Sequence, residues 1–159
     1  MIDFQFNTLN IFAFSDTHGS HRKLQVPENV DILICGGDVV EDNLEGDEYD
    51  DFVEWFASLP CKWKIFVPGN HELSFEIGRA DGIIQRMTNR GITVLEDAII
   101  DCDGVIIASI SGSSSWFSRL ANTAISDIAY SVSIAGMQIS IDFTFFSENS
   151  IAIEPPGIT

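Results

Sequence analysis

Three short apolar runs, at residues 11–14, 31–35 and 64–67, are each followed at once by glycine or polar residues. Apolar runs without alternation are typical of strands that are buried on both faces of a parallel sheet. The segments 92–95, 98–101 and 105–110 also have strand character, with a turn at Asp103-Gly104. The pattern therefore predicts a mainly parallel sheet followed by further strands.

Residues 46–60, between the second and third runs, have the pattern of an amphipathic helix. Their apolar positions recur at helical spacing, at Tyr49, Phe52, Val53, Phe56 and Leu59. Acidic residues occupy the first turns, where the helix dipole favours negative charge, and Pro60 is expected to end the helix. A second helix is predicted over 82–90, with Gly91 as its C-terminal cap. The order strand, helix, strand favours a right-handed crossover and an α/β fold.

The composition changes after residue 110. Residues 111–159 contain five charged side chains and no histidine. Alternating segments at 130–134 and 139–143 flank Gly136 and predict a hairpin, and 151–153 could form one last strand. We expect one domain over 1–159, in which 1–110 carries the recognisable pattern and 111–159 is divergent or truncated.

Composition excludes several classes of function. The formal net charge is -16, which argues against nucleic acid as a partner because binding to phosphates depends on Lys and Arg. Three cysteines without a CxxC pair indicate neither a zinc knuckle nor a disulfide framework, and Cys35 is expected to be a small buried apolar residue. No apolar run is long enough for a signal peptide or a membrane span, so a cytoplasmic location is expected.

Metal-capable side chains follow each of the three apolar runs. Asp16 and His18 follow the first, Asp38 follows the second after two glycines, and Asn70 and His71 follow the third after Gly69. In open α/β sheets, ligands bind beyond the carboxyl ends of the strands. Carboxylate, imidazole and amide donors together suit Mn, Fe or Zn. The sequence therefore predicts a site for divalent metal ions.

Each of these residues alone also has an ordinary structural explanation. A lone D-x-H is common, a GGD segment usually forms a turn, and Asn70 could cap a helix. His21 is expected to be a surface residue rather than a ligand. The repetition of the arrangement after three apolar runs favours the metal site over these explanations.

The motifs Asp16-Thr-His18, Gly37-Asp38 and Gly69-Asn70-His71-Glu72, in this order, resemble those of the calcineurin-like metallophosphoesterases. The residues in and around these motifs are most similar to those of a small subgroup related to the brain metallophosphoesterase-domain proteins. The resemblance covers roughly residues 10–110 and implies a two-sheet sandwich flanked by helices, here incomplete at the C-terminal end.

The resemblance implies roles for the matching residues. Asp16 and His18 would hold a first metal ion, Asp38 would bridge two ions, and Asn70 would bind the second. The implied ions are Mn, Fe or Zn, and the implied reaction is hydrolysis of phosphomonoesters or phosphodiesters through a metal-bound hydroxide.

Two further roles follow from the same resemblance. His71 would contact the phosphoryl group and protonate the leaving group, and Glu72 would orient His71. The implied partner is a small phosphate-ester substrate.

The chain departs from the family pattern in its second half. The later histidine ligands of both metals are absent, because the chain has three histidines and none after His71. The first ion keeps three protein ligands and the second keeps two, so one ion is expected to be held more firmly. Carboxylates that could substitute for the missing ligands are Asp127, Asp142, Glu148 and Glu154, and their spacing does not distinguish them.

Two alternatives therefore stay open beside the enzyme. The chain could be a catalytically silent or truncated remnant that acts as a binding module, or an incomplete or frame-shifted product. An incomplete fold would expose a sheet edge or an apolar face, which a homodimer could cover.

Overall fold

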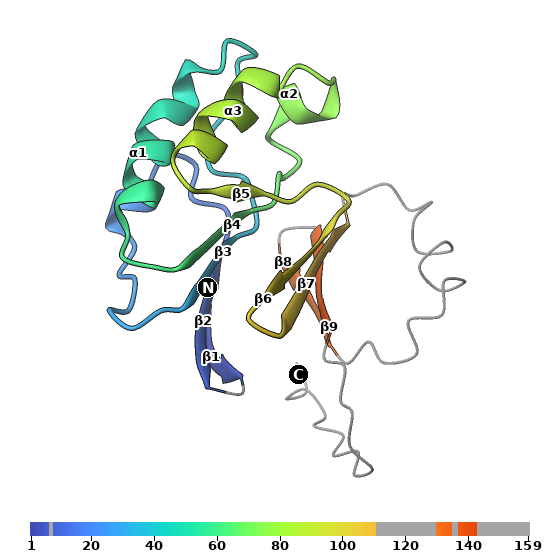
Figure 1. Cartoon of the computed structure of the whole chain (residues 1–159). Coiled ribbons are helices and arrows are strands. Elements are labelled where there is room, and N and C mark those ends of the chain that lie inside the picture. Colours follow the sequence, from blue (N-terminus) through green and yellow to red (C-terminus); the bar gives the residue numbers. More distant parts are fainter. Residues whose placement is uncertain (7, 111–129, 135–136, 143–159) are drawn as a thin grey trace, which may run out of the picture.

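In the computed structural model the strands form two sheets, of which the first has five strands in the order β1-β2-β3-β4-β5 (Figure 1). Residues 1–6, 8–110, 130–134 and 137–142 are described. The strands of this sheet are β1 (Ile2–Phe6), β2 (Leu9–Phe14), β3 (Ile32–Cys35), β4 (Trp63–Phe66) and β5 (Thr93–Val94). β1 pairs antiparallel with β2, and all other neighbours are parallel, so the predicted mainly parallel sheet is confirmed.

The helices follow the parallel strands. They are the short 3-10 helices η1 (His21–Lys23) and η2 (Asp47–Tyr49), and the α-helices α1 (Asp50–Ser58), α2 (Leu73–Glu76) and α3 (Asp81–Asn89). Leu59, after α1, is extended, as expected of a residue that precedes a proline. Both predicted helices are confirmed in α1 and α3. The short α2 has no counterpart in the sequence prediction.

The second sheet is antiparallel and has the order β6-β7-β9-β8. Its strands are β6 (Ile99–Cys102), β7 (Val105–Ile110), β8 (Tyr130–Ile134) and β9 (Met137–Asp142). The predicted hairpin is confirmed, since β8 and β9 are paired, with Ile134 opposite Met137. Gly136 and the predicted strand at 151–153 lie outside the described residues.

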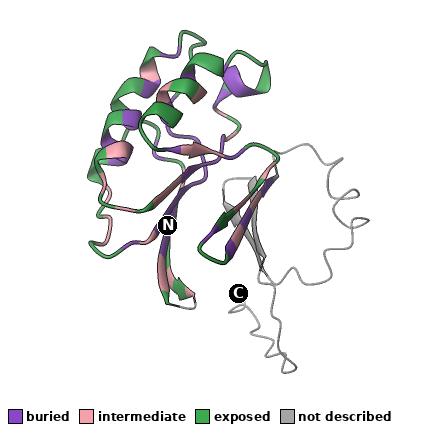
Figure 2. Ribbon diagram, in the orientation of Figure 1, coloured by how far each residue is buried: buried purple, intermediate pink, exposed green. Residues whose placement is uncertain are grey.

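Two apolar cores lie on opposite faces of the first sheet. One core joins the strands to α1 and α3, and includes Phe12, Phe14, Leu33, Cys35, Phe56, Phe66 and Met87. The other joins them to the second sheet, and includes Ile11, Ala13, Ile32, Ile34, Ile65, Cys102, Val105 and Ile107. The central strands are accordingly buried (Figure 2). Burial on both faces explains why these strands are apolar without alternation, and the two-sheet architecture with flanking helices is confirmed.

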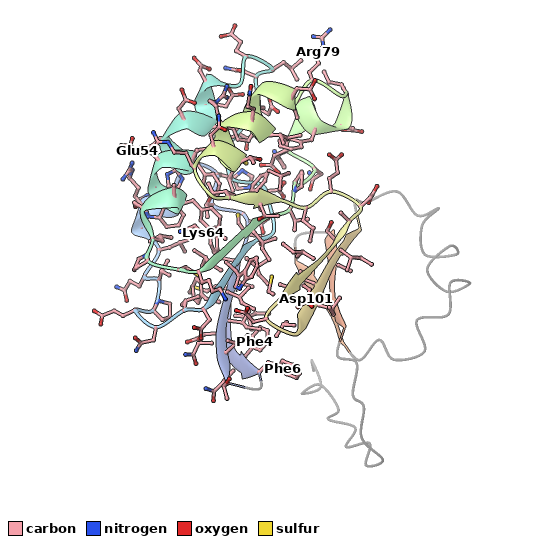
Figure 3. The ribbon with its side chains drawn as sticks, in the orientation of Figure 1. Phe4, Phe6, Glu54, Lys64, Arg79 and Asp101 are labelled. Atoms are coloured by element: carbon pink, nitrogen blue, oxygen red, sulfur yellow. The ribbon has the colours of Figure 1, made fainter. Side chains whose placement is uncertain are left out.

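β1 was not predicted, although it contributes to the second core. Phe4 and Phe6 occupy alternate positions of β1. Both pack against the core that joins the first sheet to β6 and β7 (Figure 3). A further link between the sheets is polar, because the Asp103 carboxylate accepts hydrogen bonds from Lys62 Nζ at 2.5 Å and Trp63 Nε1 at 3.0 Å. Among the described residues, no helix is both long enough and apolar enough to span a bilayer.

The prediction that His21 is a surface residue is wrong. Its side chain is 2% exposed and lies under α1, with ring centroids 5.4 Å from Phe52 and 5.0 Å from Trp55. Its Nε2 lies 3.0 Å from Asp51 Oδ2. The partner residues are distant in sequence, so the local pattern around His21 gave no sign of its burial. The ring connects η1 to α1.

Candidate metal centre

The loops that follow β2 and β3 are joined by backbone hydrogen bonds. Asp16 N donates to Gly37 O at 3.0 Å, His18 N donates to Asp38 O at 3.0 Å, and Gly19 N donates to Val39 O at 2.7 Å. The parallel register places Phe14 beside Cys35, at the same end of the sheet from which both loops start. The two motifs therefore meet as the sequence predicts, at the carboxyl edge of the sheet.

Three of the motif residues have a left-handed backbone. The φ angles are 56° at Asp16, 41° at His18 and 53° at Asp38. Residues other than glycine rarely adopt positive φ, at a cost of about 1–3 kcal/mol each, and such residues concentrate at functional sites. Because the interloop hydrogen bonds involve these same residues, the fold holds them in this conformation.

Glu72 joins the loop after β4, the third loop of the site, to the loop after β3, the second loop. Its side chain is buried, and its carboxylate accepts N–H bonds from Asp38 at 2.8 Å, from Val39 at 2.9 Å and from Gly69. Burial raises the pKa of Glu72, while the three backbone N–H groups act in the opposite direction. The carboxylate thus fixes the backbone on either side of the site.

Gly37 and Gly69 allow these two loops to approach closely. Gly37 has a φ of +82°, and a Cβ added to it would lie 2.8 Å from Glu72 Oε2 and against the backbone of Gly69. A Cβ added to Gly69 would meet the Asp38 side chain and lie 2.7 Å from Asp38 N. The glycines before the predicted ligands therefore serve close packing as well as turning.

Two imidazoles meet at a single carboxylate. His18 Nδ1 lies 2.9 Å from Glu41 Oε1, and His71 Nδ1 lies 3.0 Å from Glu41 Oε2. The two rings are edge to face, with centroids 4.9 Å apart. The Glu41 hydrogen bond raises the pKa of His71, and that bond in turn lowers the pKa of Glu41.

Glu41 was missed by the sequence analysis. Its signal was position alone, three residues after Asp38 in the loop that carries the second motif. The resemblance assigned the orientation of His71 to Glu72. The structure places the Glu72 carboxylate on loop N–H groups, and it places Glu41 on the His71 ring.

The neighbour of Glu41, Asp42, anchors this loop. Its buried carboxylate accepts hydrogen bonds from Tyr49 Oη at 3.0 Å, Leu44 N at 2.7 Å, Ser74 N at 2.7 Å and Ser74 Oγ at 2.9 Å. Burial raises the pKa of Asp42, but the hydrogen bonds from Ser74, Leu44 and Tyr49 outweigh it and leave the pKa below its usual value. Asp42 thereby holds Glu41 beside the third loop.

The other predicted site residues lie around this cluster. Asp38 is buried, and its Oδ1 accepts the His71 N–H at 3.0 Å. Asp16 is exposed and accepts a hydrogen bond from the Ser15 hydroxyl, and Asn70 is exposed. Within the described part of the chain, one group of three His, Cys, Asp or Glu side chains has its ligand atoms within 4.8 Å of one another, and it consists of His18, Glu41 and His71.

The carboxylates considered as substitutes for missing ligands are not placed by the structure. Asp127, Glu148 and Glu154 lie outside the described residues, and only the backbone of Asp142, at the end of β9, is described.

The residues present fit a divalent metal ion. Carboxylate and imidazole donors meet on three loops that the fold ties together, and the side chains of His18 and His71 are 37% and 40% exposed. An ion could therefore reach these donors from solvent. The donor set matches the preference of Mn, Fe and Zn for oxygen and nitrogen ligands.

Comparison with known proteins identifies a family for most of the chain. Residues 9–145 match the model of the calcineurin-like phosphoesterase family. The metallophosphoesterase domain-containing protein 1 of human and of mouse are each 45% identical over 62 residues, which is 39% of this chain and 18% of each relative. A UPF0046 protein of Caenorhabditis elegans is 33% identical over 111 residues, covering 61% of this chain and 37% of the relative. The matches thus span well under half the length of these relatives.

Proposed function

The chain belongs to the calcineurin-like phosphoesterase family, and we propose that it is a metal-dependent hydrolase of small phosphate esters. The observation that carries the proposal is the junction of three loops, where interloop hydrogen bonds hold Asp16, His18, Asp38 and His71. Asn70 is the residue before His71 in the third loop. The left-handed backbone at Asp16, His18 and Asp38 supports a functional rather than a purely structural role.

In the proposed site, Asp16, His18, Asp38 and Asn70 hold divalent metal, with manganese as our first choice. Bound divalent metal would supply Lewis-acid stabilisation of phosphoryl charge. It would also lower the pKa of bound water toward neutral pH. Asp38 is fixed for this role because its N–H bonds to Glu72 and its Oδ1 accepts the His71 N–H. The backbone bond from His18 N to Asp38 O keeps the first and second loops in register.

His71 is the proposed proton donor to the leaving group. Its Nδ1 is held by Glu41, which leaves Nε2 free to face a substrate oxygen. Because Glu41 raises the pKa of His71, the imidazolium persists to higher pH than that of an ordinary histidine. A positioned general acid typically contributes about 10²–10⁴-fold to the rate.

The surface charge supports a small substrate. A net charge of -16 repels polyanions, whereas a small phosphate ester needs to approach only the metal site. All three cysteines are unpaired, which supports the proposal of a reducing, cytoplasmic location. We also propose that the chain forms a homodimer, in which a second copy would cover some of the exposed apolar side chains, such as Ile77 or Ile99.

The test compares hydrolysis of bis-p-nitrophenyl phosphate and p-nitrophenyl phosphate by the manganese-loaded chain and by variants. His71→Gln should lower kcat by about 10²–10⁴-fold while manganese content is kept, and Asp38→Asn should lower both. Glu45→Gln, in the same acidic loop but outside the site, is the control and should behave as the parent.

The binding-module alternative makes a different prediction. The chain has no histidine after His71 to complete two ligand sets. If the chain were a silent descendant, it would bind manganese and Asp38→Asn would bind less. The hydrolysis rates of the parent and of His71→Gln, however, would both equal the rate with manganese in buffer alone. That result would replace the enzyme by a metal-binding remnant.

A further inference from the structure

We propose that His18, Glu41 and His71 form a second transition-metal site, which shares His18 with the site proposed for Asp16, His18, Asp38 and Asn70 and therefore competes with it. The cluster has two imidazole nitrogens within 2.9 and 3.0 Å of the two oxygens of one carboxylate. All three ligand atoms lie within 4.8 Å of one another. Two imidazoles and one carboxylate form a donor set that suits Zn²⁺ and related borderline ions.

Two of the distances in the cluster, from each imidazole to its nearest Glu41 oxygen, are close to those between ligands of one ion. Zinc lies about 2.0–2.2 Å from nitrogen and oxygen ligands in tetrahedral sites, so the ligand atoms of one ion are roughly 3.3–3.5 Å apart. The hydrogen bonds of the cluster are only slightly shorter. A small outward movement of the Glu41 carboxylate, which is 72% exposed, would let an ion replace the shared protons. Water would complete the coordination.

The fold holds the segments that carry the three ligands, in addition to the bonds between their side chains. His18 is fixed through its N–H to Asp38 O, and His71 through its N–H to the Asp38 carboxylate. Glu41 precedes Asp42, whose buried carboxylate is bonded to Tyr49 and Ser74. Donors that are placed in advance lose little freedom when an ion binds, which favours affinity.

Occupation of this site would oppose catalysis, a consequence that rests on the proposed function. A neutral imidazole has one unprotonated nitrogen, so His18 cannot serve this ion through Nδ1 and another through Nε2 while neutral. His71 coordinated through Nδ1 would no longer be an imidazolium able to give a proton. Zinc in excess is therefore expected to inhibit the manganese-loaded chain, and Glu41→Gln to relieve that inhibition.

The binding itself is tested without any substrate. The full chain, labelled with ¹⁵N on histidine, is titrated with zinc chloride and followed by long-range ¹H–¹⁵N correlation of the imidazole rings. The chain has three histidines, so the spectrum is simple, and His21, whose Nε2 is bonded to Asp51, is an internal reference. The proposal predicts metal-induced shifts at Nδ1 of His18 and His71, with His21 unchanged.

The opposite pattern would overturn the proposal. Shifts at Nε2 of His18, with Nδ1–H retained, would show that Glu41 only orients a ligand of the other site, and the absence of shifts at either nitrogen would exclude both arrangements. Removal of a residue that only hydrogen-bonds a metal ligand typically weakens metal binding by about 10–100-fold. Glu41→Gln should weaken zinc binding by more than this. Glu45→Gln should bind as the parent does. Loss of hydrolysis alone, with these shifts present, would reject the proposed function and leave the zinc site standing.

Discussion

At the residue scale, the Glu41 carboxylate decides the chemistry of His71. Its hydrogen bond and charge raise the pKa of His71 against a smaller opposing effect of burial. Glu41→Gln in the metal-free chain should therefore lower the pKa of His71 toward about 6.5, the ordinary value for histidine. The measurement is a pH titration of the imidazole ¹H resonances. The His21 resonance is the control, and an unmoved His71 titration would show that the pair does not persist in solution.

A second residue-scale prediction concerns His21, whose pKa burial lowers despite the opposing bond to Asp51. The folded chain thus favours the neutral ring, whereas an unfolded histidine binds its proton near pH 6.5. The stability conferred by neutral His21 is present above that pH and is lost as the pH falls toward the lower folded pKa. His21→Phe keeps a ring beside Phe52 and Trp55 but cannot be protonated, so its stability should fall less on acidification.

The measurement is the urea midpoint at pH 7.5 and pH 5.5. His71→Gln is the contrasting variant, because the raised pKa of His71 stabilises the fold at low pH and its removal should steepen the loss. Equal pH dependence in the parent and in His21→Phe would contradict the assigned role of His21.

Sequence reasoning worked at this scale where a residue sits beside a strand end. Asp16, His18, Asp38 and His71 are brought to one edge because parallel strands end together. It missed Glu41 and misplaced His21, since both are positioned by partners 23 or 30 residues away. Their side chains depend on how loops and helices pack, which no local period encodes.

At the element scale, Asp42 joins the loop after β3 to η2 and α2. Asp42→Ala should destabilise the fold by about 1–3 kcal/mol or more, because the donors of Tyr49, Ser74 and Leu44 lose a buried acceptor. Urea unfolding measures the change. Glu45→Ala, an exposed change in the same loop, should stay within about 0.5 kcal/mol of the parent. Equal midpoints for the two variants would remove Asp42 as an anchor.

The close approach of the second and third loops gives another element-scale prediction. Gly37 and Gly78 both have positive φ, of +82° and +69°, but only Gly37 has atoms within 4 Å of an added Cβ. Gly78→Ala should cost about 1–2 kcal/mol from backbone strain alone. Gly37→Ala should cost clearly more and should also weaken manganese binding. Similar urea midpoints for both would show that the loops are free to separate.

The elements that the sequence predicted are those with enough residues to show a period. α1 and α3, of nine residues each, and the apolar parallel strands were all anticipated. α2 has four residues, little more than one turn, so no period could mark it. In β1, exposed residues alternate with half-buried residues over most of the strand. Its one neighbour is the antiparallel strand β2, so its strand character depends on that pairing.

At the scale of the whole molecule, the sandwich places the candidate site where three loops must stay together. The two-sheet form was implied by the resemblance rather than by periodicity, since the sheets join through a core of interleaved apolar residues. An ion bound across these loops should therefore stabilise the entire fold. Ligand that binds only the folded chain adds about 2.7 kcal/mol when its concentration is 100 times Kd.

We therefore expect manganese to raise the urea midpoint of the parent chain in proportion to the logarithm of its concentration above Kd. Asp38→Asn should abolish the rise, because Asp38 is a proposed metal ligand that is buried between the second and third loops. Magnesium chloride at equal ionic strength controls for screening of the acidic surface, which any divalent salt would produce. If both salts raised the midpoint equally in the parent and in Asp38→Asn, general screening would account for the stabilisation. A manganese-specific rise that depends on Asp38 would instead show that metal binding and folding of the three loops are one linked equilibrium.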